Sequence, residues 1–193
     1  MAEEPLSPER AGDPCTIVVF GAGGDLTKRK LLPALYNLRC HGLLPKDFAI
    51  IGVARKGLDD AAFRKHLTDD MQTFATTRVD PAVWADFQKR LYYCDGAFGD
   101  AATYERLARL IARGGGENAT RENVLFYLAT PPAVFGEIVE HLGAAGLTQS
   151  EKGWRRVVVE KPFGRDFDSA RQLNERLQKV LGEKQIYRID HYL

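Results

Sequence analysis

The chain has 193 residues, of which 45% are hydrophobic and 27% charged, and its formal net charge is +1. This is the composition of a soluble globular protein, and so small a net charge gives no reason to expect nucleic acid or a membrane surface as the main partner. No apolar run approaches the ~20 residues of a membrane span. Residues 1–14 lack the apolar segment of a secretory signal, so we expect a disordered tail on a cytoplasmic protein.

The ordered part of the sequence begins with a predicted strand followed by a predicted helix. Residues 15–20 form a short apolar run rich in β-branched side chains, which is typical of a strand. A helix is predicted over about 25–40, because leucines at 31, 35 and 38 recur at the spacing of one buried face. His41-Gly42 marks the end of this helix.

Strand-like and helix-like segments then alternate to residue 190. Further strands are predicted at 48–55, 91–95, 122–130, 154–161 and 185–190, and helices at 56–74, 81–91, 101–113, 131–146 and 167–182. This alternation is typical of parallel β-α-β units, and the nearly continuous apolar runs indicate strands covered on both faces. The sequence therefore predicts an α/β fold with a doubly wound, mostly parallel sheet, a Rossmann-like domain over 15–183.

Glycines gather between the first strand and the first helix, in the stretch Gly21-Ala22-Gly23-Gly24-Asp25-Leu26. Glycines at this place let the backbone approach a pyrophosphate, whose charge is met by amides at the helix N-terminus. The pattern departs from G-x-G-x-x-G because Leu26 holds the third glycine position. The alternative is a tight turn in which Asp25 caps the helix. The strand-turn-helix context favours a dinucleotide site over that alternative.

The end of the second strand indicates which dinucleotide. An NAD site usually has an acidic side chain there, bonded to the ribose 2′-hydroxyl. In this sequence Arg55 and Lys56 follow the strand, and Asp47 lies at its other end. A guanidinium at the ribose favours a 2′-phosphate, and hence NADP, although basic residues after a strand are also common as solvated loop charges.

Cysteine and histidine chemistry is less informative. Cys15, Cys40 and Cys94 are far apart and lack metal-ligand spacing, so we expect reduced thiols and no metal site. The remaining histidines, apart from one near the C-terminus, lie on predicted helices or helix ends, where surface or capping roles are expected: His41, His66 and His141.

Four segments carry a resemblance to a known family. "GAGGDLTKRKLLPALYNL", "FYLATPP", "VVVEKPFGRD" and "RIDHYL" occur in this order. Together they resemble glucose-6-phosphate dehydrogenase, in particular the bacterial enzymes. The resemblance covers residues 15–193, and one departure is Gly23, where many relatives have serine.

The resemblance implies roles at the coenzyme. Residues 21–26 (Gly21, Ala22, Gly23, Gly24, Asp25 and Leu26) form its loop, and Arg55 holds the 2′-phosphate with help from Arg29 or Lys30. Tyr127, Ala129 and Pro131 resemble the segment that passes the nicotinamide. Lys161 is similar to a lysine that contacts both substrate and coenzyme, beside a cis-proline at Pro162.

The resemblance also implies a substrate site. His191 and Tyr192 resemble residues that bind the sugar phosphate. Asp190 resembles the carboxylate that orients a histidine base lying beyond residue 193; consecutive strand residues point to opposite faces, so His191 itself is a poor partner for Asp190. Residues 184–193 would then begin a large α+β substrate domain that is otherwise missing.

The implied reaction is oxidation of glucose 6-phosphate to the 6-phosphogluconolactone with NADP, in the pentose phosphate pathway, by a protein that is a homo-oligomer at full length. We expect the chain as given to bind NADP(H) with little or no turnover. Two alternatives stay open: another NADP-dependent Rossmann sugar oxidoreductase, and a non-catalytic NADP-binding module.

Overall fold

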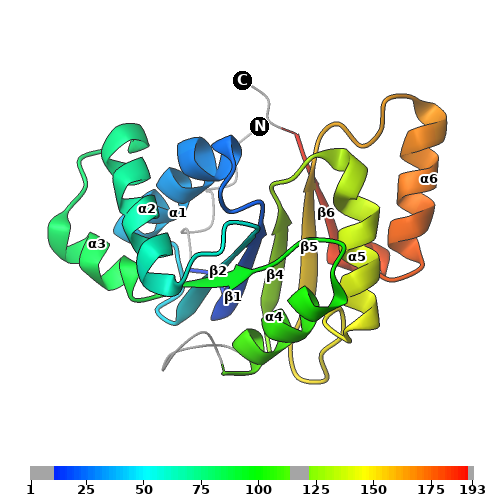
Figure 1. Ribbon diagram of the computed structural model, residues 1–193, viewed down its shortest axis with the longest axis horizontal. Coiled ribbons are helices and arrows are strands. Elements are labelled where there is room, and N and C mark those ends of the chain that lie inside the picture. The colour runs from blue at the N-terminus through cyan, green and yellow to red at the C-terminus, as the bar shows by residue number, and fades with distance from the viewer. Residues whose placement is uncertain (1–10, 114–121, 191–193) are drawn as a thin grey trace, which may run out of the picture.

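The computed structural model describes residues 11–113 and 122–190 (Figure 1). Within these residues, six parallel strands form one sheet in the order β3-β2-β1-β4-β5-β6. The strands are β1 (Cys15–Phe20), β2 (Phe48–Ala54), β3 (Leu91–Asp95), β4 (Val124–Leu128), β5 (Arg155–Glu160) and β6 (Ile186–Ile189). The predicted doubly wound α/β fold is confirmed.

Helices cover both faces of the sheet. Those described are η1 (Thr27–Leu31), α1 (Leu32–Cys40), α2 (Asp60–Phe74), α3 (Pro81–Gln88), α4 (Ala101–Arg113), η2 (Pro132–Val134), α5 (Phe135–Ala144), α6 (Phe167–Gln178) and η3 (Glu183–Gln185). In Figure 1, α1, α2 and α3 are grouped on one side of the sheet and α5 and α6 on the other. No helix of the described part of the chain is long and apolar enough to cross a membrane.

The core is divided by the sheet into two clusters. Ile17 and Val19 of β1 pack with side chains of α1, α2 and α3, whereas Val18 and Phe20 pack with side chains of α4, α5 and α6. All six residues of β1 are buried. Because the helices take up the apolar side chains of both sheet faces, the central strand is apolar without alternation.

The first helix differs from its predicted pattern. It is helical from residue 25, but η1 is a π-helical segment, which holds an extra residue per turn and rotates the following side chains. As a result Leu32, Leu35 and Tyr36 are buried, while Leu38 is 38% exposed. The prediction that Leu38 belongs to the buried face was therefore wrong.

Both predicted ends of the domain need correction. β6 was assigned to a separate domain starting at residue 184, but it pairs in parallel with β5 and is the sixth strand of the same sheet. The predicted 1–14 tail ends earlier, because Asp13 accepts a hydrogen bond from Trp154 and the carbonyl of Pro14 accepts one from Asn123. Residues 1–10 lie outside the described residues.

A glycine in β2 allows α2 to pack closely. A Cβ at Gly52 would lie 2.4 Å from the ring of the buried Phe63 and 2.7 Å from the Cβ of Ala22. We expect Gly52→Ala to lower the free energy of unfolding by about 1–3 kcal/mol, since overpacking forces the ring from its position. Denaturant unfolding measures this. Gly12→Ala, where a Cβ meets nothing within 4 Å, is the matched control, and equal stability of both variants would contradict the prediction.

Candidate coenzyme-binding site

The predicted site residues lie along one edge of the sheet. Because all six strands are parallel, the residues that follow their carboxyl ends share this edge. β1 lies between β2 and β4, where successive connections turn to opposite faces of the sheet, and ligands bind at such a switch point. The residues that directly follow β1, β2, β4, β5 and β6 are Gly21, Arg55, Ala129, Lys161 and Asp190.

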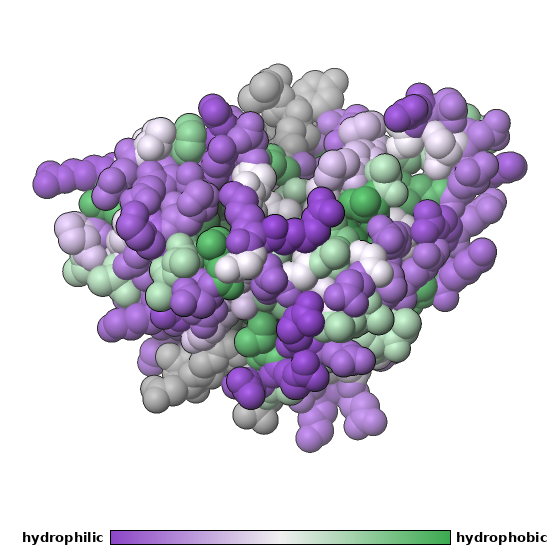
Figure 2. Space-filling view, in the orientation of Figure 1, coloured by the Kyte–Doolittle hydropathy of each residue, from purple (hydrophilic) through white to green (hydrophobic). Residues whose placement is uncertain are grey.

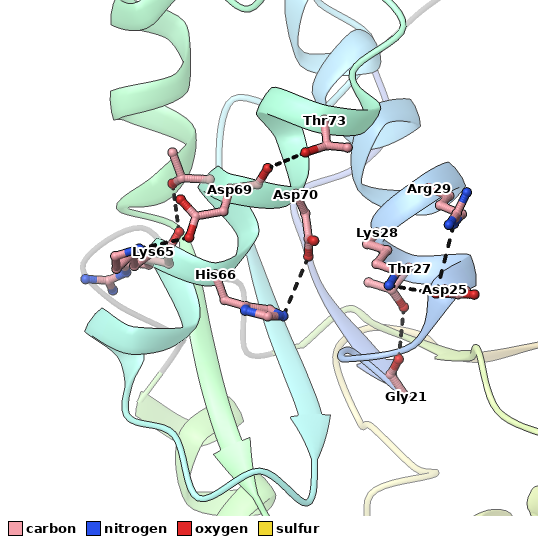
Figure 3. A network of polar contacts seen from close by, with 12 residues as sticks. Gly21, Asp25, Thr27, Lys28, Arg29, Lys65, His66, Asp69, Asp70 and Thr73 are labelled. Carbon is pink, nitrogen blue, oxygen red and sulfur yellow. Dashed lines mark hydrogen bonds and ion pairs between the residues drawn. The ribbon is translucent and has the colours of Figure 1, made fainter.

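The glycine loop forms a tight turn after β1. The amides of Gly21 and Ala22 donate to the carbonyl of Val53 at 3.0 and 3.3 Å, which ties the loop to β2. The carbonyl of Gly21 accepts from the amide of Gly24 at 2.9 Å. It also accepts from Thr27 Oγ1 at 3.1 Å (Figure 3). The loop is thus joined to the start of the first helix.

Glycine is required in this loop for space as well as for conformation. Gly21 has φ +86°, and a Cβ there would lie 2.2 Å from the carbonyl oxygen of Ala129 after β4. A Cβ at Gly23 would lie 2.9 Å from Cε of Lys56. Glycine thus lets the loop pack closely against the end of β4 and against Lys56 at the switch point, where a dinucleotide-binding fold places its phosphate loop.

Asp25 does not cap the helix. No side-chain cap hydrogen bond forms at this helix start, and Asp25 instead pairs with Lys28 at 2.7 Å and Arg29 at 4.0 Å (Figure 3). The hydrogen bond and charge of Lys28 hold the pKa of this exposed carboxyl below its usual value. The guanidinium of Arg29 also lies 4.6 Å from the ring centre of Phe74, so Arg29 is engaged within the protein.

The end of β2 carries the two cations noted in the sequence. The side chains of Arg55 and Lys56 are exposed, and neither forms an ion pair with a residue that the structure describes. The backbone beneath them is held by β3: the amide of Lys56 donates to the hydroxyl of Tyr93 at 3.1 Å, and that hydroxyl donates to the carbonyl of Ala54 at 2.7 Å. Two positive charges therefore stand on a rigid strand end beside the glycine loop.

A buried polar pair joins β4 and β5. The hydroxyl of Tyr127 donates to the carboxylate of Glu160, and these residues are 8% and 9% exposed. Burial, and then the hydrogen bond with Glu160, raise the pKa of Tyr127 above its ordinary value. Tyr127 was predicted as a site residue and Glu160 was not; the signal for Glu160 is a carboxylate that directly follows three buried valines at the end of β5.

We expect Tyr127→Phe to lower the free energy of unfolding by about 1–2 kcal/mol, because a buried carboxylate loses a hydrogen-bond donor. Urea unfolding measures the change. The control is Tyr187→Phe on β6, an exposed tyrosine whose hydroxyl makes no hydrogen bond within the described ranges. A Tyr127→Phe protein as stable as the control would contradict the prediction.

Lys161 and Asp190 meet at the ends of β5 and β6. They form an ion pair, and the peptide bond between Lys161 and Pro162 is cis, as the resemblance implied. Sequence analysis connected Asp190 with a histidine and did not foresee Lys161 as its neighbour. His191 and Tyr192 lie outside the described residues.

The described histidines have other contacts. His41 bonds the carbonyl of Asn37, His66 lies 3.9 Å from Asp70, and His141 stacks on Tyr104. Within 11–113 and 122–190, no histidine forms a hydrogen bond with Asp190.

A groove of about 480 Å³ opens between the segments that follow β4 and β5. It lies beside α6, and Figure 2 shows hydrophobic residues between α5 and α6 on a face that is otherwise largely hydrophilic. Its apolar lining includes Pro131, Pro132, Ala133, Pro162 and Leu173. The segments assigned to the nicotinamide end thus border an open apolar surface.

A parallel sheet in this order, with a glycine loop at its switch point, defines a dinucleotide-binding domain of Rossmann type. A family model described as "Glucose-6-phosphate dehydrogenase, NAD binding domain" matches residues 18–193. The chain belongs to the glucose-6-phosphate dehydrogenase family, which confirms the resemblance found in its motifs.

Individual proteins similar to this chain belong to the same family. The chain is 42% identical over 192 residues to glucose-6-phosphate 1-dehydrogenase of Chlamydia pneumoniae, and the match covers 97% of the chain and 38% of that relative. Among solved structures it is similar to glucose-6-phosphate 1-dehydrogenase from Mycobacterium avium, with TM-score 0.79, 36% identity and coverage of 92% and 36%. It is also similar to a glucose-6-phosphate dehydrogenase in complex with glucose-6-phosphate, with TM-score 0.82, 32% identity and coverage of 97% and 38%. The chain therefore spans less than two fifths of the length of these relatives.

Proposed function

We propose that this chain is the NADP-binding portion of an enzyme that oxidises glucose 6-phosphate to 6-phosphogluconolactone and produces NADPH. The observation that carries the proposal is the family match over 18–193 together with a tight glycine loop in which a Cβ at Gly21 would collide with the carbonyl oxygen of Ala129. The proposal places the whole protein in the cytoplasm, in the pentose phosphate pathway, as a homo-oligomer.

In this proposal the coenzyme lies across the switch point. The loop formed by residues 21–26 receives the pyrophosphate at the start of the first helix. Arg55 holds the 2′-phosphate, for which a guanidinium after β2 is suited by charge and by paired donors. Tyr127, held by Glu160, borders the nicotinamide end.

The sugar end of the proposed site is built from the ends of β5 and β6. Lys161 contacts both sugar and coenzyme, and His191 and Tyr192 bind the sugar phosphate. Bound NADP supplies a hydride acceptor. Oxidation of a hemiacetal also needs a base for the hydroxyl proton, and Asp190 would orient such a histidine through its second ring nitrogen and stabilise the imidazolium.

We further propose that the chain by itself binds coenzyme with little or no turnover. Support comes from Asp190, whose partner within the described residues is Lys161 and not a histidine. A non-catalytic NADP-binding module would share this behaviour, and the substrate-dependent activity of the longer protein separates the two hypotheses.

The test is a calorimetric titration of the 193-residue chain with NADP and with NAD. We expect both to bind and NADP to bind more tightly. A parallel assay follows NADPH absorbance after glucose 6-phosphate is added, and we expect no sustained rate. Failure to bind either coenzyme would contradict the proposed coenzyme role. Steady NADPH formation would contradict the proposal that the chain by itself binds coenzyme with little or no turnover.

A further inference from the structure

We infer that the ammonium of Lys56 contacts the pyrophosphate of the bound dinucleotide and so contributes equally to NADP and NAD affinity. The inference rests on the proposed coenzyme function and adds to it. It separates the two adjacent cations: Arg55 distinguishes the coenzymes, and Lys56 strengthens the binding of both.

The position of the Lys56 side chain is the first support. From the place where a Cβ of residue 23 would lie, Cδ, Cε and Nζ of Lys56 are 3.4, 2.9 and 3.2 Å away. The lysine, although exposed, therefore lies against the glycine loop. Its ammonium lies where that loop would meet a phosphate.

The second support is electrostatic. The neighbouring cation Lys28 is neutralised by Asp25 at 2.7 Å. Lys56 has no carboxylate partner in the described part of the chain, and its ammonium lies beside Gly23 of the loop. A positive charge without such a partner is available to an anion, and a lysine ammonium binds phosphate as a compact point charge.

The third support is the rigid base of the side chain. The Lys56 amide donates to the Tyr93 hydroxyl, and the next amide, of Gly57, donates to Asp95 at 2.8 Å. Both partners lie on β3. Because the backbone is fixed on that side, only the lysine side chain has to be ordered when a ligand arrives.

The matching feature on the loop is Gly23. Its φ is not in the left-handed region, so an alanine there is not strained by backbone conformation. The three atoms nearest to its Cβ all belong to Lys56. Gly23→Ala is therefore a means of displacing the ammonium while leaving its charge in the protein.

The experiment measures dissociation constants of NADP and NAD by calorimetry for the 193-residue chain and its variants. Lys56→Gln, which keeps most of the stem and removes the charge, is expected to weaken both coenzymes by the same factor, roughly three- to tenfold, and to leave their ratio unchanged. Lys46→Gln, an exposed lysine at the opposite end of β2, is the control for net charge and is expected to change neither constant.

Gly23→Ala completes a double-mutant cycle. It should also weaken both coenzymes, and Lys56→Gln should then have a smaller effect in the Gly23→Ala background than in the original chain, because the ammonium is already displaced. Additive effects would overturn the inference.

Other results of the same titrations would also overturn it. Unchanged or tighter binding by Lys56→Gln would mean that the ammonium makes no contact or is displaced by the coenzyme. A loss confined to NADP would place Lys56 at the 2′-phosphate. In each of these cases the original chain still binds coenzyme, so the proposed function stands; if the original chain binds neither coenzyme, the proposed function itself has failed.

Discussion

Gly21→Ala is expected to lower the free energy of unfolding by more than about 3 kcal/mol and to abolish measurable coenzyme binding. Two costs combine. An alanine at φ +86° is strained by roughly 1 kcal/mol or more. Its Cβ would also lie 2.2 Å from the carbonyl oxygen of Ala129, where a distance under 3.0 Å requires a shift. Because that oxygen belongs to the backbone after β4, the ends of β1 and β4 must separate.

The two costs can be measured separately. Gly42, after the first helix, has a similar φ of +70°, but a Cβ there meets nothing within 4 Å. Gly42→Ala therefore reports the conformational cost alone, which we expect to be about 1 kcal/mol with coenzyme affinity unchanged. Denaturant unfolding and calorimetric titration of both variants test this. Equal loss of stability in the two would show that the close approach to Ala129 has no energetic importance.

Arg55→Ala is expected to remove the preference for NADP over NAD. The guanidinium stands on the end of β2 without an ion-pair partner among the described residues. A charge-assisted hydrogen bond to the 2′-phosphate is worth about 1.5–3 kcal/mol, so NADP affinity should fall by roughly ten- to a hundredfold. NAD carries no 2′-phosphate, and its affinity should change little.

The measurement is the ratio of the two dissociation constants, determined for the original chain and for Arg55→Ala at one salt concentration. Arg78→Ala removes an exposed arginine from the segment between α2 and α3 and serves as the control. An unchanged ratio in Arg55→Ala would assign coenzyme selection to another residue. An equal loss for both coenzymes would place Arg55 at the pyrophosphate instead.

The class of fold and the general place of the site could be predicted from local patterns. Most strands contain an apolar run bounded by glycines, prolines or polar residues, and most helices have a periodic apolar face, so their alternation is visible in short windows. The loop at 21–26 and Arg55 follow the first two strands directly. The carboxyl ends of parallel strands share one edge, so these residues were expected to lie together.

The local pattern was insufficient at two places, where contacts between residues distant in the sequence determine the structure. Leu38 fits the helical period, but the π-helical segment Thr27–Leu31 rotates it out of the core. The strand at 186–189 has the same appearance whether it begins a new domain or extends the old sheet. Its hydrogen bonds with β5 made it the sixth strand.

The amino-acid sequence alone determined the α/β class, the family and the place of each strand to within one or two residues at its carboxyl end, because these depend on short motifs, spacing and composition. Only the tertiary structure placed Lys56 over Gly23, Glu160 against Tyr127 and Lys161 beside Asp190. These residues are about 30 positions apart in each case. Which side chains meet across such separations is set by strand order, register and packing, and these result from the folding of the whole sheet.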